Sequence, residues 1–152
     1  HAMLAKDNGV WEAEMTFWET PDAQPMKMTG TATNKTIWDN RYQQSSFKAE
    51  MGPGMTFEGL STLAYDNVRK KYVNTWIDNM STALMIMEGD YDAANKTITM
   101  TGKGTDYRTG KDVNMRQTFR MVDDNTQQME MYCTYPGGKE YKNMEITYKR
   151  KK

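Results

Sequence analysis

Residues 11–17 read WEAEMTF, and their pattern indicates the fold class. The apolar residues Trp11, Ala13, Met15 and Phe17 alternate with polar residues. A period of two is typical of a β-strand with one buried face and one solvated face. The same period recurs along the chain in further runs, at residues 26–33, 36–43, 46–51, 55–65, 72–78, 82–88, 97–102, 113–122, 127–134 and 141–149.

Short turn signals separate these runs, as at Pro53-Gly54 and Asp123-Asp124-Asn125, and no run has the period of a long helix. We therefore predict an all-β fold, an antiparallel up-and-down barrel of about ten strands. At most one short helical turn is expected, within residues 2–7. The barrel is expected to be one domain over residues 1–152, with residues 1–8 as an N-terminal extension.

Composition excludes several classes of function. The 152 residues include 20 Lys and Arg against 20 Asp and Glu, so the formal net charge is zero and a nucleic-acid partner is not expected. Cys133 is the single cysteine and His1 the single histidine, which leaves no intramolecular disulfide and no Cys- or His-based metal site. We expect no metal and no cofactor. No apolar run approaches the roughly 20 residues of a transmembrane helix, so no transmembrane segment is expected.

Folding neighbouring strands about their turns predicts their registers. Phe119 falls opposite Met129 across residues 123–125, and Met131 falls opposite Met144 across residues 136–139. Apolar side chains then share one face over three strands, as a correct register requires. The opposite face carries charged and polar side chains that we interpret as a solvated ladder rather than a catalytic cluster, namely Arg116, Thr118, Arg120, Glu130 and Glu145.

The middle of the chain, residues 55–87, has two apolar faces. Pairing residues 55–65 with 72–78 places Leu63 opposite Asn74 on one face, and one of the two faces is expected to line the barrel interior. The other face collects apolar side chains, predicted as Leu60, Ala64, Val73, Ile77, Met85 and Met87. Since a large uncovered apolar patch is unusual on a monomer, we expect the N-terminal segment or a second subunit to cover it. This motivates a homodimer hypothesis.

The 15 methionines are open to two interpretations, because methionine fills irregular space either in an ordinary core or around a variable apolar ligand. The first functional hypothesis is a module that binds a small hydrophobic ligand inside the barrel. Its predicted contact surface is Met115, Phe119, Met129, Met131 and Met144, with polar groups near the mouth from Trp76, Tyr65 or Tyr132. A fully packed barrel is the alternative, and a cavity of about 300 Å³ or more would distinguish the two.

A second hypothesis is a barrel enzyme that uses acid–base chemistry, with Asp78, Glu58, Arg41 and Tyr65 as the nominated groups. Its alternative is that Asp66 and Asp78 accept backbone hydrogen bonds in tight turns. We favour the turn role and nominate no catalytic residue. Cys133 is interpreted as a small buried apolar residue, since no histidine is available to activate it. The third hypothesis is a structural or interaction protein that dimerises through its sheet.

Gly9-Val10-Trp11 at the start of the first strand and Arg150 at the end of the last resemble the calycin (lipocalin-like) signature. This resemblance implies that the Trp11 ring plugs one end of the barrel and that Arg150 packs across it. Attraction between a guanidinium and an indole makes such a contact favourable.

A longer set of motifs resembles the domain-of-unknown-function 1579 family over nearly the whole chain from Gly9. The motifs are Phe57-Glu58-Gly59, Tyr65-Asp66-Asn67, Lys71-Tyr72-Val73, Trp76-Ile77-Asp78, Glu88-Gly89, Gly110-Lys111, Glu130-Met131-Tyr132 and Met144-Glu145-Ile146. This resemblance implies a bacterial protein with a closed or nearly closed lipocalin-like barrel and no established activity. It also implies an extracytoplasmic location, periplasmic or secreted, although no signal sequence is evident from His1 onward.

Overall fold

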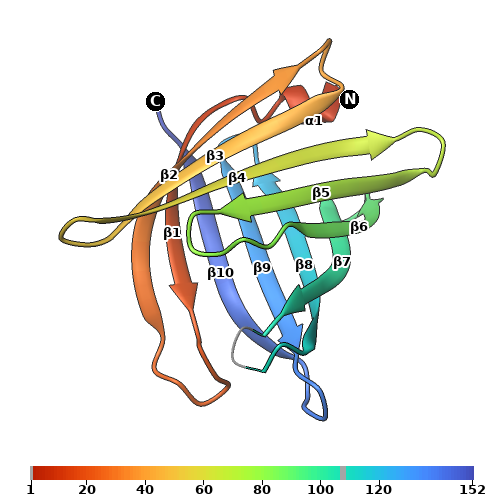
Figure 1. Cartoon of the computed structure of the whole chain (residues 1–152). Helices are drawn as coiled ribbons and strands as arrows, with labels where there is room; N and C mark the ends of the chain where they lie inside the picture. Colours follow the sequence, from red (N-terminus) through yellow and green to blue (C-terminus); the bar gives the residue numbers. More distant parts are fainter. Residues whose placement is uncertain (1, 107–108) are drawn as a thin grey trace.

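Ten antiparallel strands and one short helix make up the fold in a computed structural model of the chain, which describes residues 2–106 and 109–152 (Figure 1). The elements are α1 (Ala2–Ala5), β1 (Gly9–Phe17), β2 (Met26–Ile37), β3 (Tyr42–Gly52), β4 (Met55–Asp66), β5 (Lys71–Asp78), β6 (Met85–Asp92), β7 (Thr97–Thr105), β8 (Asp112–Asp123), β9 (Thr126–Thr134) and β10 (Tyr141–Arg150). Among these residues no helix has the length and apolarity needed to cross a membrane.

Each strand pairs with its neighbours in the sequence, and β1 pairs with β10 to close the barrel (Figure 1). Closure runs from Trp11 opposite Arg150 to Phe17 opposite Met144. Because a closed sheet has no unpaired edge, the backbone hydrogen bonds of the outermost strands are satisfied within the chain. The predicted up-and-down barrel with one short N-terminal helical turn is confirmed.

The registers predicted from the alternation are also confirmed. Phe119 lies opposite Met129, Met131 opposite Met144, and Leu63 opposite Asn74. Successive residues of β9 alternate strictly between half-buried and buried positions, as expected for a strand with one face in the core.

The boundary between β2 and β3 differs from the prediction. A turn interrupts the strand expected at residues 36–43. The three runs predicted between residues 26 and 51 therefore form two long strands, β2 and β3. Trp38, Asp39 and Asn40 all have φ between 50° and 63°. Successive residues in this left-handed region reverse the chain, and only Asp39-Asn40 signalled the turn in the sequence.

The predicted facing of Met85 and Met87 was wrong. Met87 pairs with Asn74 and is buried in the barrel, and Met85 packs against the same core. Ile86 takes the outer face instead. The loop at residues 79–84 left the register between β5 and β6 unspecified, and a slip of one residue moves every side chain to the opposite face.

An outer apolar patch nevertheless exists, formed by Leu60, Ile77 and Ile86, which are 39%, 45% and 53% exposed. Leu60 lies opposite Ile77 across β4 and β5, and Ile86 lies on the neighbouring strand β6. The N-terminal segment does not cover this patch, because α1 contacts β2 and β3. The alternative in which the N-terminal segment shields this face is therefore wrong.

Candidate functional site

The interior of the barrel contains a cavity of about 400 Å³ whose lining comes from all ten strands. Eleven of the 15 methionines contribute to it, which are Met15, Met28, Met51, Met80, Met85, Met87, Met100, Met115, Met129, Met131 and Met144. They surround a space as well as filling a core.

One end of the barrel is plugged. The Trp11 ring is buried there, the Arg150 guanidinium lies 4.3 Å from its centroid, and the indole N–H donates to the Asp7 carbonyl at 2.9 Å. Arg150 also donates to the backbone carbonyls of Lys6, Asn8 and Asp124 at 2.8 to 3.3 Å. This is the arrangement predicted from the sequence, and it ties the N-terminal segment to the end of β10.

The plug includes a buried carboxyl group, that of Asp7. Gln127 Nε2 donates to Asp7 Oδ1 at 2.6 Å, and Gln43 Nε2 donates to the carbonyl of Leu4 in α1 at 2.8 Å. Burial raises the pKa of Asp7 to about 6, although the Gln127 hydrogen bond, the positive charge of Arg150 and Gln43 each act to lower it. No pattern in the sequence pointed to this group, because Asp7 precedes the first strand and lies outside the alternation.

The opposite end of the barrel leads to solvent. Met51 at the end of β3 and Met80 in the loop after β5 both line the cavity, and they are 38% and 58% exposed. Both therefore have one side toward the cavity and one toward water. We call this end of the cavity, near Met51, Asp78 and Met80, the mouth.

An aromatic row leads toward the mouth across β3, β4 and β5. Phe47 and Phe57 have ring centroids 6.0 Å apart, and Phe57 stacks on Trp76 at 6.2 Å. The Trp76 ring occupies the space above Gly59, where an added Cβ would lie 2.2 Å from the ring. The Trp76 indole N–H donates to Asp78 Oδ2 at 2.8 Å, and the Met80 amide donates to Asp78 Oδ1 at 2.9 Å.

Two polar side chains in the lining have an unsatisfied oxygen. Asn34 Oδ1 on β2 and Asn143 Oδ1 on β10 are buried and accept no hydrogen bond. Leaving a buried acceptor unpaired costs about 1–3 kcal/mol, so each oxygen favours a partner that brings a donor. Alternation could have placed Asn34 inside, but Asn143 lies at a β-bulge between Lys142 and Met144, where counting by two fails.

Most of the residues predicted to bind a ligand line the cavity. The six that do are Trp76, Met115, Phe119, Met129, Met131 and Met144. Tyr65 does not, because its ring packs 4.8 Å from Tyr72 at the end of β4 nearer the plug. Tyr132 was also misplaced as a group near the mouth, since it lies on the outer face of β9.

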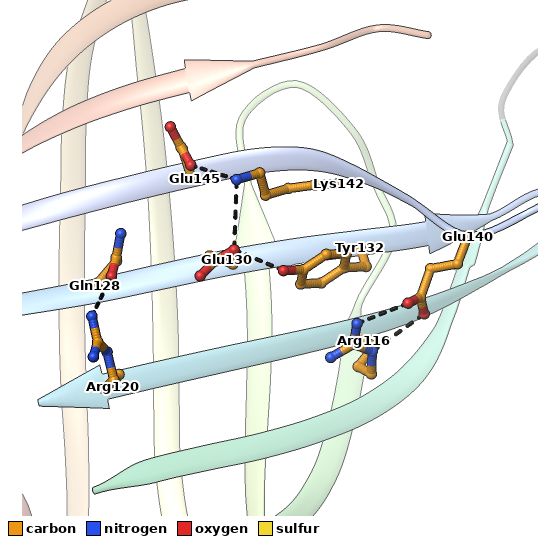
Figure 2. Close-up of polar contacts among 8 residues, drawn as sticks. All are labelled: Arg116, Arg120, Gln128, Glu130, Tyr132, Glu140, Lys142 and Glu145. Carbon is orange, nitrogen blue, oxygen red and sulfur yellow. Dashed lines mark hydrogen bonds and ion pairs between the residues drawn. The ribbon is translucent and has the colours of Figure 1, made fainter. Parts of the chain in front are cut away.

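The outer face of β8, β9 and β10 carries the predicted polar ladder (Figure 2). Arg116 makes two hydrogen bonds to Glu140, at 2.8 and 3.2 Å, and its guanidinium lies 4.1 Å from the Tyr132 ring centroid. Tyr132 donates to Glu130 at 2.7 Å, and Lys142 bridges Glu130 and Glu145 (Figure 2). The ladder pairs its charges on the outside of the barrel.

The groups nominated for acid–base catalysis do not meet. Glu58 pairs with Lys48 at 3.3 Å on the outer surface, and Arg41 lies in the exposed turn before β3. Only Asp78 reaches the cavity. The turn role is confirmed, because Asp66 accepts from the amides of Val68 and Arg69 while Asp78 accepts from that of Met80.

Cys133 is buried as predicted, and burial raises the pKa of its thiol. Burial likewise raises the pKa of the Tyr148 phenol, which lines the cavity. A thiol held in its neutral form by its surroundings is a poor nucleophile. The sequence-based interpretation of Cys133 as a small core residue agrees with this environment.

Comparison with known proteins supports the fold. The sequence profile of the family described as Protein of unknown function (DUF1579) matches residues 1–150. The crystal structure of Rv2717c from M. tuberculosis superposes with a TM-score of 0.74 at 12% identity, over 99% of this chain and 96% of that one. The S-type phycobiliprotein lyase CPES from Guillardia theta gives a TM-score of 0.64 at 9% identity, over 99% and 92%. No curated protein matches the sequence.

Proposed function

We propose that this chain, which belongs to the DUF1579 family of proteins of unknown function, binds a small and mostly apolar molecule inside its barrel. The observation that carries the proposal is the cavity of about 400 Å³. Ligand pockets typically span about 300–1,000 Å³ and combine an apolar lining with a few polar groups. This cavity has both features.

The size of the cavity argues against a barrel that is simply packed. Protein interiors are close-packed and rarely leave voids much larger than a water molecule. The methionine side chains around this space are flexible and polarizable, so they suit an apolar molecule of variable shape. The barrel of the phycobiliprotein lyase supports the fold and does not identify a ligand for this chain.

The test uses two substitutions on one strand, one of a side chain that faces the cavity and one of a side chain that faces outward. Leu63 of β4 lines the cavity, while Leu60 of the same strand lies on the outer face and is exposed. Leu63→Trp would place an indole in the cavity, and Leu60→Trp would add the same ring outside. Binding is measured by the fluorescence of the neutral apolar probe N-phenyl-1-naphthylamine.

We expect saturable binding of one probe per chain, weakened at least several-fold by Leu63→Trp and unchanged by Leu60→Trp. The outer apolar patch near Leu60 makes this control strict, because surface binding of the probe would respond to that substitution. No saturable binding to the wild type, or equal losses in both variants, would overturn the proposal.

A second candidate function, dimerisation through the outer sheet, is favoured by the patch of Leu60, Ile77 and Ile86. Sedimentation velocity tests it. A dimer that dissociates in the Ile77→Lys variant would support this function, and a monomer at every concentration would remove it.

An extracytoplasmic location is a separate proposal from the family resemblance, tested by immunoblotting of periplasmic and cytoplasmic fractions of the native host.

A further inference from the structure

Charge in the cavity lining is unbalanced. Of the lining residues in ranges 2–106 and 109–152, Asp78 is the one whose side chain normally carries a charge at neutral pH, and none is Lys, Arg or His. The positive side chains of the neighbouring wall, such as Arg116 and Lys142, are engaged with glutamates on the outer face. An anionic ligand group would therefore meet no positively charged side chain among these lining residues and would face a carboxylate.

Asp78 has capacity left to accept a ligand. Each of its oxygens accepts one hydrogen bond, from the Trp76 indole and from the Met80 amide. A carboxylate offers about four lone-pair sites, so about two remain for a donor approaching through the mouth. Its two partners also fix its direction, since Trp76 of β5 and Met80 in the loop that follows hold the carboxylate at the cavity wall.

The ring beside Asp78 adds a second attraction for positive charge. Trp76 of β5 stacks on Phe57 and covers Gly59, so two contacts with β4 fix the orientation of its ring. A cation within about 6 Å of an indole face is attracted by the ring, more strongly when water is excluded. An ammonium group at the mouth would meet a carboxylate and an aromatic ring together.

The unpaired polar groups of the lining favour the same sign. The two unpartnered atoms of the lining, Asn34 Oδ1 and Asn143 Oδ1, are both acceptors. A hydroxyl or amine N–H can satisfy them, whereas a carboxylate or phosphate has no proton to offer at neutral pH. The methionine-rich wall between them suits an aliphatic or aromatic body.

We infer that the cavity selects cationic amphiphiles, with the ammonium group at Asp78 beside Trp76 and the apolar body among the methionines. This inference rests on the proposed function and adds the class of ligand. It predicts an order of affinity for ligands that share one tail: an amine binds better than an alcohol, and an alcohol better than a carboxylate.

The test is displacement of N-phenyl-1-naphthylamine by decylamine, decanol and decanoate, each below its aggregation threshold. Decylamine is expected to displace the probe at roughly tenfold lower concentration than decanoate, the scale of one charge-assisted hydrogen bond. In Asp78→Asn this preference should largely disappear while the neutral probe still binds. Retained probe binding shows that the variant is folded around its cavity.

The matched control is Glu58→Gln, which changes the net charge by the same amount on the outer face of β4. It should leave the order of the three ligands unchanged. Equal displacement by decylamine and decanoate in the wild type would overturn the inference even if Asp78→Asn failed to fold. If the probe itself does not bind, the proposed function fails first, so the two failures are distinguishable.

Discussion

Replacing the buried Asp7 by asparagine is expected to stabilise the protein at neutral pH. Burial raises the pKa of Asp7 from 3.8 to about 6 in the folded state. The unfolded chain therefore loses this proton first as pH rises above 4, and stability falls until the folded group is also ionised above pH 6. At 1.36 kcal/mol per pKa unit, the accumulated cost is about 3 kcal/mol.

Asp7→Asn retains the Oδ1 acceptor for Gln127 and removes the ionisation. We expect the variant to gain about 2–3 kcal/mol over the wild type at pH 7.5 and almost nothing at pH 4. For a chain of this length the gain at pH 7.5 corresponds to roughly 5–10 °C in Tm.

Urea and thermal unfolding, followed by circular dichroism at both pH values, measure the difference. Glu14→Gln is the control, because Glu14 is exposed on the outer face of β1. An Asp7→Asn variant that is less stable than the wild type at pH 7.5 would refute the reasoning. That result would mean that attraction to Arg150 outweighs the cost of burying the charge.

Three further predictions test the plug, the mouth and the core. Gly59→Ala should cost about 1–3 kcal/mol in urea unfolding and shift the fluorescence of the displaced Trp76, while Gly104→Ala, whose added Cβ would have its nearest neighbour at 3.6 Å, should cost less than 1 kcal/mol. Arg150→Met should destabilise by at least about 2 kcal/mol, because backbone carbonyls at the plug lose their donors, and hydrogen exchange should accelerate in residues 2–8 before the rest of the barrel. Cys133 should react with 5,5′-dithiobis(2-nitrobenzoate) only after unfolding, and rapid reaction of the native protein would contradict its buried position.

Alternation of side chains was sufficient to predict the barrel and most of its interior. Where two strands join through a short turn, the turn fixes the register, as it does for Phe119 and Met129. Where a longer loop intervenes, as between β5 and β6, the sequence does not determine which face Met85 and Met87 take. Alternation is a local signal. It does not fix the register of two strands when the loop between them is long enough to allow more than one pairing.

The polar groups of the cavity were harder to predict for a different reason. Asn143 reaches the interior through a bulge, and Asp7 becomes buried only because a segment before the first strand folds over the barrel end. Both depend on contacts between residues far apart in the chain. The outer ladder around Arg116 was predictable because it follows the same alternation as the core.

The two inward carboxyl groups, Asp7 and Asp78, show why recognition of a head group belongs at the mouth. Asp7 is buried in the plug, where Gln127 donates to its carboxyl oxygen and the Trp11 indole donates to its backbone carbonyl. Asp78 accepts hydrogen bonds from one indole and one backbone amide, and it lines the cavity. A ligand that reached Asp7 would have to displace the hydrogen bonds that close the barrel, whereas one at Asp78 adds a partner and breaks none. Specificity can therefore be changed at Asp78 with little effect on folding, while changes at Asp7 affect stability first.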